Sequence, residues 1–512
     1  LPETQDGEPI CQSWRQMVNI GYAHDGLIGS VQEQLRRAQK EIGFTYLRFH
    51  GIFDDDMHIY QENEDGSPWF NFAYADLLFD FIQEIGLIPY VELGYMPSKL
   101  AKTQYTVFDN PAICISMYND SEKWQALVQA CLSHWIDKYG LANVRKWRFT
   151  VFSMNYSRLQ YTAPVMSHED YCKMFEATYQ TIKMIDPELK LGGAGCFPGI
   201  ALAPDGLRRF LLDVKEHGCP PDFITVQCYP HEDFSQDSDF FYFTSKQTSM
   251  PSVLSKDKNF TLHFLQRLNR IRQEIGFADC PVVVEEWNST LWQRDLSGDT
   301  CYKAAWLIKN VLQNYDQAEY LGYWLLTDFL DEWLVPGGVF HGGYGLFTIN
   351  GIPKAGYQAL RMLGRIGERK IASGEGWFVS RTENTIQVYL YHYCHYDALY
   401  RYRYQKLTDP HDAYKVFEVD GRLKIELELC GLDPGVYRQE SWTLNRSAGS
   451  TFDKWLEMEA PRVMTPEDLN YLNDMAQPLC KIRDTDTAGA LHLQTELEPH
   501  EVRLIVLKKR DG

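Results

Sequence analysis

The chain has 512 residues, 45% of them hydrophobic and 23% charged, and its 50 Lys and Arg against 69 Asp and Glu give a formal net charge of −19. These proportions are those of a folded globular protein and exclude disorder as the dominant state, and no run of about 18 apolar residues is present to span a membrane. Because an acidic surface repels phosphate backbones, we expect neither a nucleic acid nor a membrane as a partner of this chain.

From about residue 14 the sequence alternates short apolar runs with amphipathic helices. Residues 30–42 have helical spacing, with Val31, Leu35 and Ala38 on one face, and a strand-like run follows at 44–49. The pattern then continues with helices at 72–85, 121–139, 169–185, 260–275 and 301–313, and with strands at 88–93, 147–152, 189–194, 223–227, 282–286 and 320–325. About eight such units predict an α/β fold, a (β/α)8 TIM barrel with a parallel sheet.

After about residue 370 the pattern changes to period-two strands separated by Asp-Gly and Pro-Gly turns. The expected strands are 378–380, 385–393, 415–419, 423–429, 437–444 and 501–507, with one helix at 465–474. This arrangement predicts an accessory antiparallel β-sandwich.

Twelve cysteines are scattered along the chain, and none has the CxxC or other spacing of a metal site. Buried free thiols in a reducing compartment explain them most simply, which predicts a cytoplasmic protein without a metal or cofactor. The chain begins Leu-Pro-Glu-Thr rather than with Met, so we expect it to be an excised part of a longer protein. The aromatic content of 14% suits either large cores or a carbohydrate site, and composition does not separate the two.

Reactive groups of a barrel lie at the C-terminal ends of its strands. Glu286 ends the run at 282–286 beside Trp287, a position that suits the nucleophile of a retaining glycosidase; an ion-paired structural acid is the alternative. A retaining enzyme needs a second carboxyl group about 5–5.5 Å away, and the strand end expected to supply it carries Met154, which has no proton to donate. Asp54–Asp56 could hold a metal, although a hydrogen-bonded loop is favoured.

At these residues the chain resembles glycoside hydrolase family 39, the retaining β-xylosidases. The motifs that carry the resemblance are Arg48-Phe-His-Gly-Ile-Phe-Asp-Asp-Asp-Met57, Pro89-Tyr-Val-Glu-Leu-Gly-Tyr-Met-Pro97, Val284-Glu-Glu-Trp-Asn288, Phe340-His-Gly-Gly-Tyr-Gly-Leu346, Gly351-Ile-Pro-Lys354 and Pro499-His-Glu-Val-Arg-Leu504. The resemblance implies a barrel over residues 14–360 and a sandwich built from residues 1–13 and 361–512.

The resemblance assigns roles one position at a time. It implies that Glu286 is the nucleophile, and it places five residues in or near sugar-contacting loops: His50, Tyr229, Trp324, Asp331 and Glu332. The family's Phe-Glu-Val-Trp-Asn-Glu-Pro-Asn reads Phe149-Thr-Val-Phe-Ser-Met-Asn-Tyr156 here, so Met154 occupies the acid/base position and Ser153 that of the Asn that would bind the sugar 2-hydroxyl. Gln227 stands near the position at which the family has a His before Tyr-Pro, here Tyr229-Pro230. Several changes around one strand end are typical of a natural variant rather than an engineered trap.

The stretches at 19–27 and 31–35 also resemble the variant of this family found as the C-terminal module of AraC-type transcriptional regulators. The leading hypothesis is therefore a catalytically impaired module that binds a xylose-type saccharide as a sensor. The alternatives are an active retaining β-xylosidase with a displaced acid such as Glu285, Asp331 or Glu332, and a non-binding scaffold that forms a homo-oligomer. A carboxylate other than Glu286 within about 6 Å of it and facing an open pocket would favour the active enzyme.

Overall fold

Eight parallel strands close into a barrel in a computed structural model that describes residues 7–104, 112–153, 166–232, 253–330, 338–402 and 407–510. In spatial order the barrel strands are β2 (Met17–Tyr22), β3 (Tyr46–His50), β6 (Ile88–Leu93), β7 (Arg148–Val151), β8 (Lys190–Cys196), β9 (Phe223–Cys228), β12 (Val282–Trp287) and β13 (Tyr320–Tyr323). The predicted (β/α)8 barrel is therefore confirmed. Its first strand, β2, was missed because its six residues lack a preceding helix to mark the repeat.

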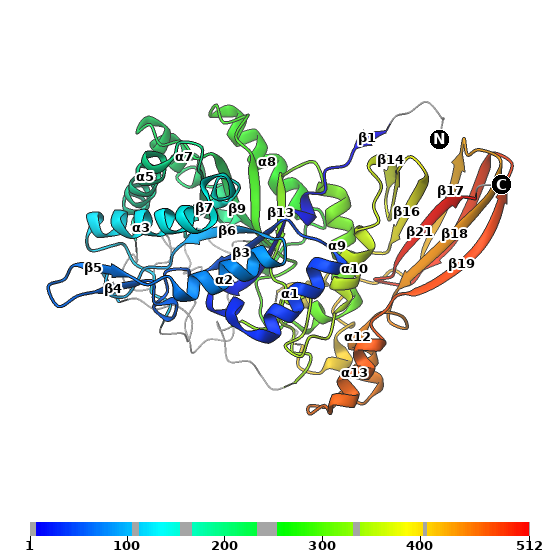
Figure 1. Ribbon diagram of the computed structural model, residues 1–512. Coiled ribbons are helices and arrows are strands. Elements are labelled where there is room, and N and C mark those ends of the chain that lie inside the picture. Colours follow the sequence, from blue (N-terminus) through cyan, green and yellow to red (C-terminus); the bar gives the residue numbers. More distant parts are fainter. Residues whose placement is uncertain are drawn as a thin grey trace.

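Helices cover the outside of the barrel (Figure 1). The longer ones are α1 (Gly29–Glu41), α2 (Ala73–Glu84), α3 (Ser121–Tyr139), α5 (His168–Ile185), α7 (Leu207–Glu216), α8 (Phe260–Glu274), α9 (Cys301–Asn314) and α10 (Ala355–Leu363). Local sequence fixes several ends. Asp120 accepts hydrogen bonds from the backbone N–H groups of Glu122 and Lys123 at the start of α3, and Gly140, with φ 83°, ends that helix.

Short elements lie in the connections of the barrel. They are α4 (Leu141–Val144), α6 (Pro198–Ala201), the hairpin of β4 (Tyr60–Glu62) and β5 (Pro68–Phe70), and the pair β10 (His231–Glu232) and β11 (Val253–Leu254). The N-terminal end of the barrel interior is filled by a separate apolar cluster that includes Met17, Tyr90 and Tyr320. Polar side chains consequently gather at the opposite, C-terminal end, where a barrel carries its site.

An antiparallel sandwich follows the barrel and lies at the right of Figure 1. Its larger sheet has the order β1-β14-β15-β16-β21-β18-β19, with β1 (Glu8–Pro9), β14 (Arg369–Gly374), β15 (Trp377–Arg381), β16 (Thr385–Tyr391), β21 (Val502–Lys509), β18 (Gly435–Leu444) and β19 (Leu479–Thr487). The second layer pairs β17 (Leu423–Cys430) with β20 (Ala490–Leu497). Val388, Ile425 and Leu493 share one apolar cluster, so the two layers pack face to face.

The N-terminal strand β1 pairs with β14, so a segment that precedes the barrel contributes to the sandwich sheet, as the family resemblance implies. The strand predicted at 415–419 is wrong: residues 415–416 form a turn, Phe417 makes an isolated bridge to Tyr396, and residues 418–419 are irregular. Val416 and Phe417 are buried, the Phe417 ring stacks on Tyr302 and Tyr396, and the Val416 carbonyl accepts from the backbone N–H of Asp397, just before α11 (Ala398–Arg401). Two helices, α12 (Thr451–Glu457) and α13 (Pro466–Asp474), project at the lower right of Figure 1.

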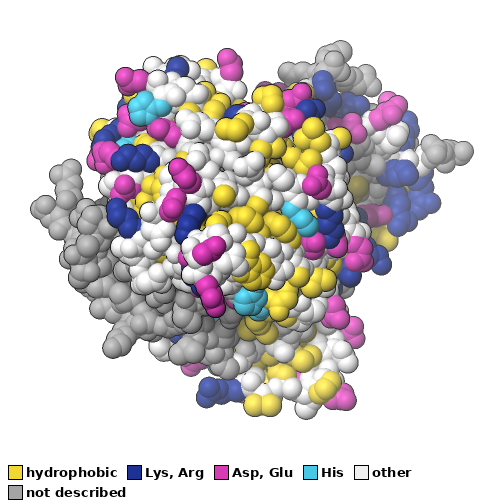
Figure 2. Space-filling model, turned by 60° about the vertical axis from the view of Figure 1, so that its left-hand side comes forward, with side chains coloured by type: hydrophobic (Ala, Val, Ile, Leu, Met, Phe, Trp, Pro, Cys, Tyr) yellow, Lys and Arg dark blue, Asp and Glu magenta, His cyan; other side chains and the backbone are white. Residues whose placement is uncertain are grey.

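All twelve cysteines are free, and eight of them are buried. Among the described residues, no helix combines the length and the apolar character needed to cross a membrane. Figure 2 shows that Asp and Glu side chains are interspersed with Lys and Arg over the upper left of one face, while hydrophobic side chains gather near its centre. That part of the surface therefore does not present the continuous basic patch that binding to phosphate backbones requires.

Candidate functional site

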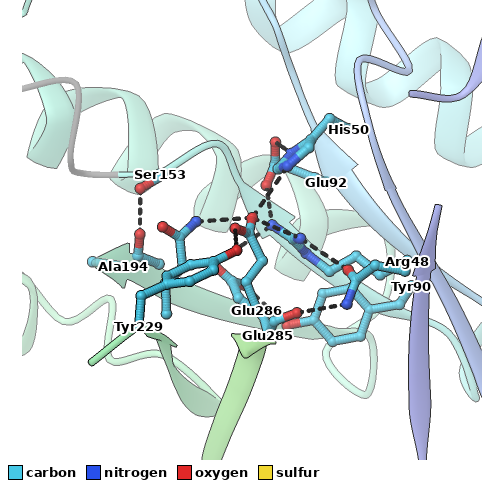
Figure 3. Close-up of polar contacts among 12 residues, drawn as sticks. Arg48, His50, Tyr90, Glu92, Ser153, Ala194, Tyr229, Glu285 and Glu286 are labelled. Atoms are coloured by element: carbon cyan, nitrogen blue, oxygen red, sulfur yellow. Dashed lines mark hydrogen bonds and ion pairs between the residues drawn. The ribbon is translucent and has the colours of Figure 1, made fainter. Parts of the chain in front are cut away.

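Four side chains converge on the carboxylate of Glu286 at the C-terminal end of β12 (Figure 3). Its Oε1 atom lies 3.0 Å from Arg48 Nη1, 3.1 Å from His50 Nε2 and 3.0 Å from Gln227 Nε2. Its Oε2 atom accepts a 3.0 Å hydrogen bond from the hydroxyl of Tyr229. These groups come from β3, from the end of β9 and from the residue that follows β9, so the ends of two other strands define the position of one carboxylate on β12.

A bulge in β12 turns two adjacent glutamates toward the barrel interior. Pairing of β12 with β9 shifts between Val284 and Glu286, so Glu285 has no partner in the ladder. In a regular strand these neighbours would point to opposite faces. Here Glu285 lies 3.7 Å from Arg48 and accepts a 3.4 Å hydrogen bond from Tyr90, one layer deeper than Glu286. The bulge thus explains how the sequence Glu285-Glu286 supplies two carboxyl groups to one site.

Arg48 and His50 bring a third carboxylate, Glu92 of β6, into the same network. Arg48 Nη2 donates to Glu92 Oε2 at 2.7 Å, and His50 Nδ1 lies 2.7 Å from Glu92 Oε1. Arg48 also donates to Asn19 Oδ1 at 3.1 Å, while the Asn19 amide donates to the backbone carbonyl of Glu285 at 3.0 Å. The network therefore ties β2, β3, β6 and β12 together below the barrel mouth.

The surroundings of Glu286, His50 and Glu285 shift the pKa of each side chain and so set which of them carry a charge. Burial alone would raise the pKa of Glu286, but Arg48 and the hydrogen bonds from His50 and Tyr229 lower it to about 2. Burial alone would lower the pKa of His50, but Glu92 and the contact with Glu286 raise it to about 10. Burial, together with Glu92 and Glu286, raises the pKa of Glu285 to about 8 against the effect of Arg48. At neutral pH the site holds an ionised Glu286 and a protonated Glu285.

The structure brings His50, Gln227 and Tyr229 together on Glu286, as the positions of these residues at strand ends suggest. The buried Trp324 faces His50, with ring centroids 5.0 Å apart. Ser153 is buried at the end of β7, and its hydroxyl donates to the carbonyl of Gly195. Three further predicted positions, Met154, Asp331 and Glu332, lie outside the described residues.

Sequence reasoning did not select Arg48 and Glu92 as site residues, although both stand in strands of the barrel. The available signal was a charged residue inside an otherwise apolar strand, which needs a partner when it is buried. The loop after β3 is hydrogen-bonded, as favoured from the sequence. Asp54 accepts from the Tyr95 backbone N–H and Asp55 from that of Ser98, each at 3.0 Å.

An ionised carboxylate held at a barrel mouth can attack a carbon atom or stabilise a developing positive charge. The Glu286 side chain retains 8% of its accessible surface, whereas the side chains of Glu92 and Glu285 retain 1% and 2%. Within the described residues, Glu286 is therefore the carboxylate of this network best placed to meet a ligand.

The chain matches known proteins along its length. It is 26% identical to the β-xylosidase of Geobacillus stearothermophilus over 506 residues, covering 98% of this chain and 94% of that protein. It is 33% identical to the β-xylosidase of Caldicellulosiruptor saccharolyticus over 365 residues, covering 70% of each. A weaker match, 22% over 233 residues, is to an uncharacterised HTH-type transcriptional regulator of Staphylococcus aureus and covers 45% of this chain and 29% of that protein.

Among solved structures, a monomeric β-xylosidase from Caulobacter crescentus superposes with a TM-score of 0.86 at 22% identity, covering 100% of this chain and 99% of that one. This similarity supports the observed combination of barrel and sandwich. The model of glycosyl hydrolases family 39 matches residues 1–492. The chain therefore belongs to glycosyl hydrolases family 39.

Proposed function

We propose that this chain binds a xylose-type saccharide at Glu286 and hydrolyses it slowly or not at all. The observation that carries the proposal is the contrast between two positions. Glu286 is ionised and held by four side chains, as a glycosidase nucleophile requires, whereas the position expected to hold the acid/base carboxyl is Met154. Two carboxyl groups are needed for retaining glycoside hydrolysis, one to attack and one to protonate the leaving oxygen.

The expected loss of rate is large. General acid catalysis contributes about 10²–10⁴-fold. A contact to the sugar 2-hydroxyl that strengthens in the transition state contributes several kcal/mol more, and Ser153 stands where the family has the Asn that makes it. The Ser153 hydroxyl donates to Gly195 instead. Together these changes make turnover of an ordinary glycoside very slow.

The sugar class and the biological role rest on similarity and on the surviving side chains. Trp324, His50 and Tyr95 bring aromatic rings close to one another at the site, and such rings stack on sugar faces. The β-xylosidases among the relatives favour a xylose-type ligand. The match to an HTH-type regulator supports a sensory module of a longer regulator, in which saccharide binding rather than hydrolysis is the useful event.

Titration calorimetry with xylobiose, together with a hydrolysis assay on the same preparation, tests the proposal. We expect saturable binding that is weakened by His50→Ala and by Tyr229→Phe, with little release of xylose. Turnover of xylobiose near about one per second would contradict impairment. Absence of binding to xylose and to xylo-oligosaccharides would contradict the sensor and favour the dimerisation scaffold.

The second candidate, an active retaining β-xylosidase with a displaced acid, is favoured by one observation. Glu285 is a carboxyl group that keeps its proton near neutral pH, with a pKa of about 8, although its side chain is almost entirely buried. If it protonates the leaving oxygen, Glu285→Gln abolishes xylobiose hydrolysis and Asp331→Asn and Glu332→Gln do not. If either of the latter abolishes it, the acid lies in that segment.

A further inference from the structure

Three potential metal ligands meet on the outside of the barrel, away from Glu286. His168 and Cys172 are four residues apart on α5, so their side chains lie one above the other on one face of the helix. Asp213 of α7 faces them. His168 Nε2 is 2.9 Å from Asp213 Oδ2 and 3.5 Å from Cys172 Sγ, and the three ligand atoms lie within 4.8 Å of one another.

One nitrogen of the imidazole makes both contacts, and this limits what the trio can do. In a nucleophile–base–orienter relay, the thiol meets one ring nitrogen and the carboxylate meets the other. Here Nε2 of His168 faces both Cys172 Sγ and Asp213 Oδ2, so a proton relay through the ring is not built. A nitrogen, a sulfur and an oxygen instead lie within 4.8 Å of one another, a spacing from which small movements could bring them around one metal ion.

We propose that His168, Cys172 and Asp213 bind a divalent transition-metal ion, with Zn²⁺ the ion whose preferences they match. Tetrahedral bonds of about 2.0–2.3 Å to nitrogen, oxygen and sulfur place the ligand atoms roughly 3.4–3.6 Å apart. The His168–Cys172 separation of 3.5 Å already fits, and the His168–Asp213 separation of 2.9 Å needs an opening of about 0.5 Å. An imidazole with a thiolate excludes Ca²⁺ and Mg²⁺, which prefer all-oxygen sets.

Burial of the three side chains suits an ion that enters from solvent. Cys172 is 5% exposed, the His168 side chain 13% and the Asp213 side chain 36%. The sulfur is therefore shielded, while the carboxylate lies at the rim, where solvent supplies a fourth ligand. Because the ligands come from neighbouring helices, the ion would join the first turn of α5 to α7. Tyr171, between the two α5 ligands, donates to the carbonyl of Ala194 in β8, so this turn also contacts the barrel.

One cation competes for the proposed site. Arg209 Nε lies 3.5 Å from Asp213 Oδ2, and its Nη2 atom lies 2.6 Å from Glu169 Oε1. A guanidinium beside a ligand carboxylate opposes a second positive charge there. Removing Arg209 should therefore tighten metal binding at this site. Glu169, which is exposed, would partly compensate the charge of the ion.

The test uses the full chain after treatment with a chelator. Stoichiometric Co²⁺, a spectroscopic substitute for Zn²⁺, should give one bound ion per chain with a thiolate-to-cobalt absorption band that Zn²⁺ displaces. Competition with a chromophoric chelator gives the affinity. Cys172→Ala and Asp213→Asn should weaken binding on the order of a hundredfold, whereas Cys280→Ala, which removes a half-buried thiol elsewhere, should not. Arg209→Gln should tighten it several-fold.

Each outcome decides the proposal. A thiolate band that persists in Cys172→Ala identifies another cysteine, such as the exposed Cys11 or Cys430, and overturns it. Absence of the band in the unmodified chain also overturns it, as does Arg209→Gln without tighter binding. If Cys172→Ala does not fold, the partly exposed Asp213→Asn answers the same question. Zn²⁺ should also raise the melting temperature of the unmodified chain and not that of Asp213→Asn.

Discussion

Arg48 and Glu286 form an ion pair of 3.0 Å in which the guanidinium has no accessible surface. The same guanidinium serves Glu92 and Glu285, so three carboxyl groups depend on one cation. Removing one partner of a buried pair leaves an uncompensated charge and costs about 3–5 kcal/mol. We expect Arg48→Met to lower the free energy of unfolding in urea at pH 7 by at least that amount.

Arg36→Met is the matched control for Arg48→Met, because Arg36 pairs with Glu84 at 3.1 Å and their side chains are 45% and 63% exposed. Exposed ion pairs contribute about 0–1 kcal/mol. The double variant Arg48→Met/Glu286→Gln should recover part of the loss, since it removes one of the stranded charges. A cost for Arg48→Met no larger than that of Arg36→Met would contradict the central role of the Arg48 guanidinium.

Glu286 should be glycosylated by an aryl β-xyloside with a good leaving group. The ionised carboxylate attacks the anomeric carbon, and the aryloxide departs with the bonding electron pair, so no general acid is needed. Because the acid/base position is Met154, no base there activates water, and the ester should persist. Intact-mass spectrometry should detect one xylosyl addition, which Glu286→Gln abolishes. No adduct after long incubation would count against a competent nucleophile.

Restoring the missing carboxyl should have little effect by itself. Met154→Glu returns the acid/base group, but Ser153 and Gln227 still differ from the family pattern. We expect the xylosyl adduct of Met154→Glu to break down somewhat faster than that of the unmodified chain. Turnover of xylobiose should still stay well below about one per second, because the transition-state stabilisation from the 2-hydroxyl contact, several kcal/mol, is still missing. Full activity from this single change would show that the other departures are neutral.

Glu285 should make stability fall as pH rises. Its pKa is about 8 in the folded protein against 4.5 as the ordinary value, so between these limits the folded state holds a proton that the unfolded state has released. Stability then decreases by about 1.4 kcal/mol per pH unit from this group. Glu285→Gln removes this pH-dependent contribution. The free energy of unfolding of Glu285→Gln in urea, relative to that of the unmodified chain, should therefore increase from pH 5 to pH 8. A constant difference across that range would contradict a protonated Glu285.

The barrel was readable from the sequence because its helices carry strong local signals. Asp120 and Gly140 bound α3, and the predicted range 121–139 agrees with the observed helix. The sandwich was harder. Residues 415–419 have the composition of a strand, but Phe417 makes only one isolated bridge and packs on Tyr302 and Tyr396. Tertiary packing decided this outcome, and local strand propensity does not contain that information.

The candidate site was predictable only where a single position carried the signal. Glu286 was found because an acid that ends an apolar strand is conspicuous. The contacts of Arg48 with Glu92 and Glu286 depend on which strand ends face one another across the closed barrel, and on the bulge that turns Glu285 inward. The spacing of residues along the chain predicts neither the register of the barrel strands nor the bulge in β12. The trio of His168, Cys172 and Asp213 was missed for the same reason, because its third member comes from another helix.

Lys354 should stabilise the folded protein by holding together two loops at the C-terminal end of the barrel. Its Nζ atom lies 2.5 Å from Asp299 and 2.6 Å from Asp328, and all three side chains are at most 1% exposed. Asp328 lies beyond the end of β13 and Asp299 in the connection after β12, so one ammonium joins the two loops.

Lys354→Met leaves two buried carboxylates without their cation and should lower the free energy of unfolding in urea by about 3–5 kcal/mol. Lys415→Met, at a side chain that is 69% exposed, should lower it by under about 1 kcal/mol. The triple variant Lys354→Met/Asp299→Asn/Asp328→Asn should regain much of the loss, because the buried charges are then gone; equal costs for the two lysine variants would contradict the bridge.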